Sequence, residues 1–164
     1  MTPPIEAHIE AHLSCSPKEA ALSFVRYLTA RGLTFHRDTR NCWKDKIYYW
    51  VQHGDACICF ISIGDPDEPE HRWTIWSGDC AAYETSAVRD EIRNAAWRYV
   101  NHCGSCGSCD GGREKLVFGR RFPQVCGCTF RIDNAVPADL PFLKAMVDLQ
   151  LRHASMTTHG GHEA

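Results

Sequence analysis

The chain has 164 residues, with 18 Lys and Arg against 20 Asp and Glu, and a formal net charge of -2. Hydrophobic residues make up 44% of it, enough for the core of one domain, which excludes an intrinsically disordered protein. The slight acidity argues against general binding to nucleic-acid phosphates. No run approaches the roughly 18 apolar residues of a membrane span, and Glu6 and Glu10 interrupt the segment where a signal peptide would be apolar. We therefore expect a cytoplasmic protein with no membrane partner.

Two helices are predicted at the start of the chain. A repeated Ile-Glu-Ala-His motif gives residues 1–14 an apolar helical stripe, and we expect a short helix or arm there. A longer helix is predicted to begin at Ser16, because Pro17 then takes the first helical position and Glu19 completes a capping box. Gly32 is expected to end this helix.

After Gly32 the hydrophobic period changes toward two, which predicts an antiparallel sheet. Gly54 and Asp55 fit a two-residue hairpin turn between two of its strands. Residues 65–70 contain two Pro and four acidic residues, so we expect an exposed loop there. The strands predicted in this part are residues 33–36, 47–53, 57–63 and 73–76.

The last part of the chain is predicted to contain helices on either side of two more strands. One helix is expected over residues 86–101, directly before a cysteine cluster. Strands are expected at residues 114–118 and 128–132, followed by a helix capped by Asp139. Residues 154–164 are expected to be a disordered tail.

The cysteine cluster predicts a metal site. Ten Cys are about 6% of the chain, fewer than the roughly 8–10% of a disulfide scaffold, so clustered thiols indicate metal ligands or reactive groups. Two overlapping Cys-x-x-Cys turns at residues 103–109, spaced only by Gly and Ser, are followed after sixteen residues by a Cys-Gly-Cys sequence. Tight turns let thiolates approach within the about 4 Å that a tetrahedral ion requires. The ligands predicted for one structural Zn²⁺ ion are Cys103, Cys106, Cys109 and Cys126.

Cys128 is the alternative fourth ligand. On an extended strand it lies about 7 Å from Cys126, so both can bind only if the chain turns at Gly127. Buried thiols and an iron–sulfur cluster are competing interpretations, although the usual cluster motif has a further Cys followed by Pro. The expected fold is α+β: an antiparallel sheet packed by two to three helices over residues 15–153, with a C-terminal four-cysteine zinc hairpin at residues 103–130.

Five short motifs follow one another in a definite order along the chain. They are the W-x-I-W-S strand at residues 73–77, the A-W-x-x-V segment at 96–100, the C-x-x-C-x-x-C run, Phe118-Gly119 and Val125-Cys126. In this respect residues 40–147 resemble an uncharacterised bacterial family of small cysteine-rich proteins. Three upstream cysteines and one downstream form the pattern of that family, so the resemblance implies Cys126 rather than Cys128 as the fourth ligand. It implies no activity.

The strands are rich in aromatic residues and also carry two thiols. Trp50, Trp73 and Trp76 are candidate ligand-binding residues, if they share a sheet face that no helix covers; the alternative is plain core. Alternation places Cys57 and Cys59 on one face of a strand, as small core residues or, alternatively, as a dithiol.

These observations predict a small zinc-binding protein that acts as a binding module for a small ligand or a protein partner. One alternative is soft-metal handling or redox sensing, in which Cys128 exchanges with a zinc thiolate. Another is a nucleic-acid-binding zinc ribbon that uses the basic residues Arg120 and Arg121, beside Arg113 and Lys115. No catalytic motif is recognisable, and we favour a non-catalytic protein.

Overall fold

The computed structural model describes residues 4–40, 43–107 and 109–159, and within them the chain forms a seven-stranded antiparallel sheet and five α-helices. This confirms the expected α+β class. The helices are α1 (Ile5–His12), α2 (Cys15–Ala30), α3 (Ala82–Thr85), α4 (Asp90–Arg98) and α5 (Leu140–His159). The strands are β1 (Thr34–Arg37), β2 (Ile47–His53), β3 (Ala56–Ile63), β4 (Trp73–Ser77), β5 (Val100–His102), β6 (Arg113–Val117) and β7 (Arg120–Asp133). None of the helices in these ranges has the length and apolar character to cross a membrane.

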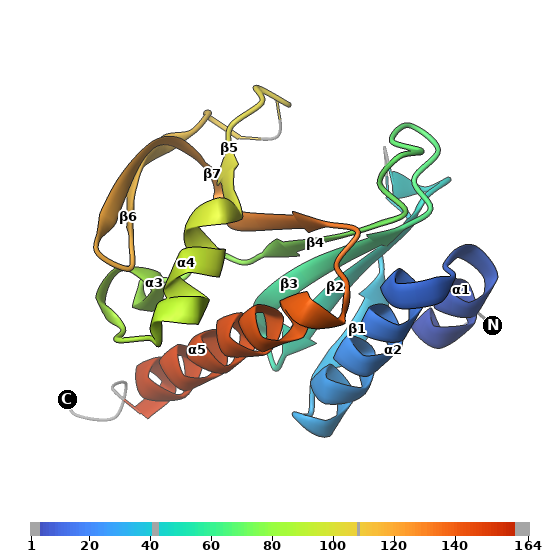
Figure 1. Ribbon diagram of the computed structural model, residues 1–164, viewed down its shortest axis with the longest axis horizontal. Coiled ribbons are helices and arrows are strands. Elements are labelled where there is room, and N and C mark those ends of the chain that lie inside the picture. Colours follow the sequence, from blue (N-terminus) through green and yellow to red (C-terminus); the bar gives the residue numbers. More distant parts are fainter. Residues whose placement is uncertain (1–3, 41–42, 108, 160–164) are drawn as a thin grey trace.

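Strand β7 joins two parts of the sheet. The strand order is β1-β2-β3-β4-β7-β5, and β6 also pairs with β7. The last residues of β7 pair with β4, its first residues pair with β6, and β5 pairs with it at Val125 and Phe130. The hairpin of β6 and β7 curves away from α1, α2 and α5 and lies beside α3 and α4 (Figure 1). The sequence predicts only the end of this strand, at residues 128–132. Register shifts opposite both β5 and β6 break the period-two pattern in its first half.

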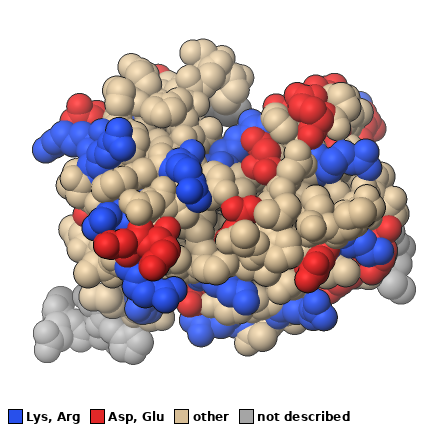
Figure 2. All heavy atoms as spheres, in the orientation of Figure 1, with Lys and Arg blue, Asp and Glu red and all other residues tan. Residues whose placement is uncertain are grey.

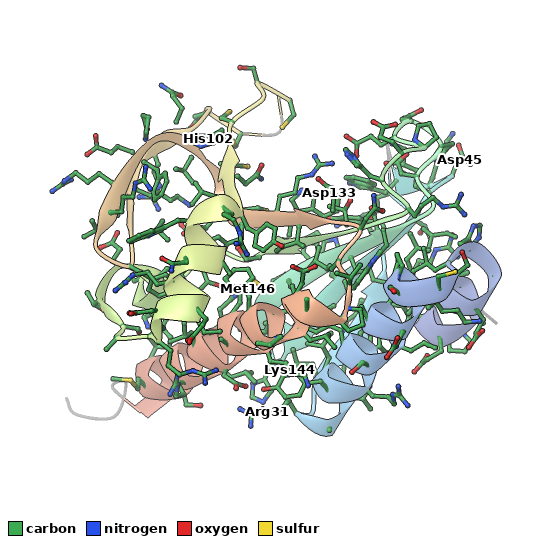
Figure 3. The ribbon with its side chains drawn as sticks, viewed as in Figure 1. Arg31, Asp45, His102, Asp133, Lys144 and Met146 are labelled. Atoms are coloured by element: carbon green, nitrogen blue, oxygen red, sulfur yellow. The ribbon has the colours of Figure 1, made fainter. Side chains whose placement is uncertain are left out.

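Helices α1, α2 and α5 cover one face of the main sheet (Figure 1). Met146 of α5 is 1% exposed and lies between the helix and the sheet (Figure 3). The side chain of Gln150 is also buried, and its amide donates to the Ile58 carbonyl oxygen (2.7 Å) and to the Tyr83 hydroxyl (2.8 Å). The side chains that fill the face of the sheet beneath the helices include Tyr49, Val51, Ile61, Ile63, Trp73 and Ile75.

The helix ends differ from the sequence predictions. Helix α2 begins at Cys15 and has no side-chain cap, so the predicted capping box at Ser16 is wrong. Helix α4 begins only at Asp90, and residues 100–102 form β5 instead of the last helical turn, because their backbone pairs with β7. Helix α5 continues to His159, past the expected end at residue 153. The rest of the expected tail, residues 160–164, lies outside the described residues.

The hairpin between β2 and β3 has the predicted two-residue turn. His53 pairs with Ala56, and Gly54 between them has φ +58°. A β-bulge further along places Cys57 opposite Gln52 and Cys59 opposite Val51. Because successive residues of β2 point to opposite faces, the two thiols also point to opposite faces, and the prediction that they share one is wrong.

Candidate functional site

The cysteine loop, residues 103–112, of which all but residue 108 are described, connects β5 to β6 and lies beside the middle of β7 (Figure 1). His102, the last residue before the loop, pairs with Val125 of β7 and is labelled in Figure 3. Arg113, the first residue after the loop, pairs with the same Val125 from the other edge of the strand. Both ends of the loop are therefore held beside the residue that directly precedes Cys126.

The first and last residues of the cysteine loop also touch each other. The Cys103 N–H donates to the Gln124 carbonyl oxygen at 2.7 Å. Gly112 packs so closely that a Cβ on it would lie 2.6 Å from the Cβ of Cys103 and 2.7 Å from the carbonyl carbon of Gln124. Real Cβ atoms do not make contacts this short, so the loop closes at its base only because residue 112 is Gly.

The backbone of the loop turns back toward its first thiol. The Ser105 N–H donates to Cys103 Sγ at 3.4 Å. Ser105 itself has φ +57°, and Gly107 and Gly111 have φ +79° and +107°. An N–H group aimed at a sulfur orients that sulfur as a ligand, and the positive φ values are those that tight thiolate turns require.

The predicted zinc ligands are placed on this loop and on the strand beside it. Cys103 and Cys126 are half-buried, whereas Cys106 and Cys109 are exposed. Within residues 4–40, 43–107 and 109–159, no three His, Cys, Asp or Glu side chains are arranged so that they could hold a metal ion. The loop is therefore anchored beside the predicted fourth ligand, while the thiols themselves are not gathered.

Cys128, the alternative fourth ligand, is half-buried, and its thiol interacts electrostatically with those of Cys126 and Cys57. Burial, with a smaller effect of these two thiols, raises the pKa of Cys128 to about 12. Burial also raises the pKa of Cys57 to about 11. Both groups are therefore protonated at neutral pH, the form in which a thiol is a weak nucleophile.

An aromatic row crosses the sheet on the face opposite the helices. The register pairs Trp50 with Phe60 and Phe60 with Trp76, and at the far end Trp76 pairs with Arg131 of β7. The rings of Trp50 and Phe60 lie 5.4 Å apart, edge to face. All three rings are half-buried rather than enclosed. Trp50 and Trp76 therefore share a face on which aromatic surface reaches solvent.

Trp73 lies on the other face of the sheet. It is completely buried, and its indole N–H donates to the Ala135 carbonyl oxygen at 3.1 Å. Since Trp73 and Trp76 are an odd number of positions apart on one strand, their side chains point to opposite faces. Of the three predicted ligand-binding Trp residues, the structure thus brings two together and places Trp73 in the core.

A charged cluster that sequence reasoning missed lies between the two parts of the sheet. The Lys115 side chain is 5% exposed, and its ammonium group donates to Asp79 (3.0 Å), to the Thr129 hydroxyl (3.0 Å) and to the Gly127 carbonyl oxygen (3.4 Å). Arg113 binds the other oxygen of Asp79 at 2.8 Å. The four side chains of the cluster line a cavity of about 320 Å³. No sequence pattern signals the cluster, because Asp79 lies 36 and 50 positions from Lys115 and Thr129.

The substitution Asp79→Asn is expected to reduce the free energy of unfolding by about 2 kcal/mol. Removing one partner of a fully buried ion pair costs roughly 3–5 kcal/mol. The loss is smaller here, because the Asp79 side chain is 46% exposed and Lys115 keeps two neutral partners. Urea unfolding of the purified variant measures the effect. The double variant Asp79→Asn with Lys115→Met should recover most of the loss. If the double variant loses as much stability as the single variant Asp79→Asn, the ion pair is not the source of the loss.

The same cluster predicts a loss of stability in acid. Burial by itself raises the pKa of Asp79, but hydrogen bonds and charge from Lys115 and Arg113 outweigh it and lower the pKa overall. A carboxylate with a lowered folded pKa stabilises the fold above its unfolded pKa of about 3.9, and the contribution is lost as the pH falls through the folded pKa. As the pH falls below about 4, the free energies of unfolding of wild type and Asp79→Asn, measured by urea titration, should therefore converge.

The basic residues near the cysteine loop are largely paired. Lys115 and Arg113 bind Asp79, and Arg121 binds Glu114 at 3.0 Å. On the face that carries α2 and α5, positive and negative side chains are interspersed (Figure 2). On this face the described side chains therefore do not form the continuous basic surface that the nucleic-acid alternative needs.

Comparisons of the chain with protein-family models, with curated proteins and with solved structures find no match.

Proposed function

We propose that the protein is a zinc-binding module. One Zn²⁺ ion is held by Cys103, Cys106, Cys109 and Cys126 and fastens the cysteine loop to β7, and the aromatic face of the sheet binds a ligand or a protein partner. The main support for the zinc site is that both ends of the cysteine loop pair with Val125, immediately before Cys126.

The chemistry of the donors supports zinc in a structural role. Four thiolates fill a tetrahedral Zn²⁺ ion and leave no position for a reactive water molecule. Binding free energy of order 10 kcal/mol or more becomes folding free energy when the site forms only in the folded chain. The metal would add this stability to the exposed cysteine loop at the edge of the sheet, where Cys106 and Cys109 are exposed.

The binding role of the aromatic face rests on its exposed surface. Trp50, Phe60 and Trp76 form a contiguous row that no side chain encloses completely. Large aromatic rings that are partly exposed together are typical of surfaces that bind a partner or ligand.

Metal analysis tests the zinc site. Protein purified without added metal is expected to contain one equivalent of zinc, and Cys126→Ser should lose it, because three thiolates and a hydroxyl bind zinc far more weakly. Cys15→Ser, which replaces an exposed thiol on α2, is the matched control and should keep the metal. Elemental analysis combined with free-thiol titration before and after chelation measures both.

Two outcomes would contradict this proposal. Iron in place of zinc, with the brown colour of a cluster, would replace the zinc site by an iron–sulfur site. Zinc that survives Cys126→Ser but is lost in Cys128→Ser would move the fourth ligand to Cys128.

The variant Cys128→Ser also tests the thiol-exchange alternative. If the Cys128 thiol exchanges with a zinc thiolate, its removal changes how readily oxidant releases the metal; if it does not exchange, the release is unchanged.

A further inference from the structure

The side chains that border the aromatic face carry an excess of carboxylate. Trp43 extends the aromatic face, because its ring stacks on Tyr48 (3.9 Å) and Tyr48 stacks on Phe60 (5.9 Å). Three cations reach these rings: Lys46 lies over Trp43, Arg40 over Trp50 and Arg131 over Trp76, each at 5.3 Å from the ring centre. These cations are paired with five carboxylates, those of Asp38, Asp65, Asp67, Glu68 and Asp133. Around the aromatic face, five carboxylates are therefore paired with only three cations.

Part of this negative charge is available to solvent. The side chain of Asp67 is 75% exposed and that of Glu68 is 37% exposed, although Asp67 pairs with Lys46, and Glu68 pairs with Arg131 and lies 3.7 Å from His71 Nδ1. Asp133, at the end of β7 (Figure 3), is 30% exposed and shares Arg131 with Glu68. A polyanion that approached the rings would meet these carboxylates, whereas a cation would be attracted by them and by the ring faces.

The protein also shows how a cation binds at this face. Arg131 stacks on Trp76 and donates to Glu68 (2.9 Å) and Asp133 (3.1 Å) at the same time. Arg40 repeats the arrangement with Trp50 and Asp38 at the other end of the row. A guanidinium group suits such sites because it is planar, weakly hydrated and able to stack and pair together.

We infer that the aromatic face binds an extended, arginine-bearing segment of a partner protein. Arginine side chains of the partner would lie over the partly exposed rings of Trp50, Phe60 and Trp76 and pair with the carboxylates at the border. This inference rests on the proposed role of the aromatic face as the binding surface and adds the chemistry of the partner. It does not depend on the zinc site.

The test uses fluorescence anisotropy with the full chain and a labelled peptide of alternating Arg and Gly. Binding is expected, and it should weaken at least tenfold in Trp76→Ala, since aromatic anchors dominate such interfaces. Asp67→Asn, which removes a 75% exposed carboxylate paired with Lys46, should weaken it several-fold and keeps the test valid if Trp76→Ala is unstable. Trp97→Phe, on α4, is the matched control and should bind as wild type does.

The remaining outcomes overturn the inference in different ways. A peptide with Gln in place of Arg that binds equally well, and is weakened by Trp76→Ala, would keep the aromatic face as the binding surface but remove its preference for cations. Oligothymidylate that binds more tightly than the Arg peptide would replace the protein partner by nucleic acid. No binding by any of these probes would reject the arginine-bearing partner. The zinc content of the same samples tests the metal site separately.

Discussion

The substitution Gly112→Ala is expected to weaken zinc binding at least tenfold, although it changes no thiol. The added Cβ would lie 2.6 Å from the Cβ of Cys103 and 2.7 Å from the carbonyl carbon of Gln124. Neither neighbour is the flexible end of a long side chain, so the base of the loop must open. Cys103 would then move away from the strand that carries Cys126, and changes that misplace a ligand typically cost 10–100-fold in metal affinity. Competition with a chromogenic zinc chelator measures the change.

A second glycine of the same loop provides the control for this experiment. A Cβ on Gly104 would meet nothing within 4 Å, and Gly104 does not have a positive φ, so Gly104→Ala should bind zinc as the wild type does. Tryptophan fluorescence of both variants checks that the main sheet is folded. If Gly112→Ala binds zinc normally while Cys126→Ser does not, the closed base of the loop has no part in forming the site.

The largest loss of stability is expected from Trp73→Ala. This side chain is completely buried beneath the helices, and its indole N–H donates to the Ala135 carbonyl oxygen. Truncating a buried Trp to Ala costs about 3–5 kcal/mol, from lost apolar contacts and the cavity left behind. A domain of this size has roughly 5–15 kcal/mol of stability in total, so much of it would be lost. Chemical unfolding of the variant measures the effect.

Trp76→Ala is the matched control, since it removes the same side chain from the same strand on the opposite face. Because Trp76 is half-buried, its loss of stability should be about 1–2 kcal/mol. Equal losses in the two variants would contradict the assignment of Trp73 to the core and Trp76 to the surface. The comparison therefore tests the register on which the aromatic row depends.

Local patterns predicted part of this structure well. Strand β2 has the predicted bounds, and the turn at Gly54 follows from two adjacent residues that favour it. The apolar stripe near the amino terminus forms α1, in which Ile5 and Ile9 are buried. Each of these features depends on residues within one turn or one strand, so the sequence contains all the information that they need.

Long-range pairing decided the features that the patterns missed. Residues 100 and 101 are predicted to end a helix but belong to β5, because β7 offers this segment backbone partners. The first half of β7 has an irregular pattern and is a strand because β5 and β6 flank it. Cys57 and Cys59 point to opposite faces because a bulge in β3 leaves Ile58 unpaired and sets the two thiols opposite adjacent residues of β2, Gln52 and Val51.

The spacing of the cysteines is a property of the sequence alone, since it depends on a short run of Gly, Ser and Cys. The sequence by itself therefore determined the α+β class, the helical and strand periods and the candidate zinc ligands. Only the tertiary structure decided which Trp residues share a face, that Lys115 pairs with Asp79, and that Val125 holds both ends of the loop. These relations join residues far apart in the chain, and strand register, which no local pattern encodes, fixes which of them meet.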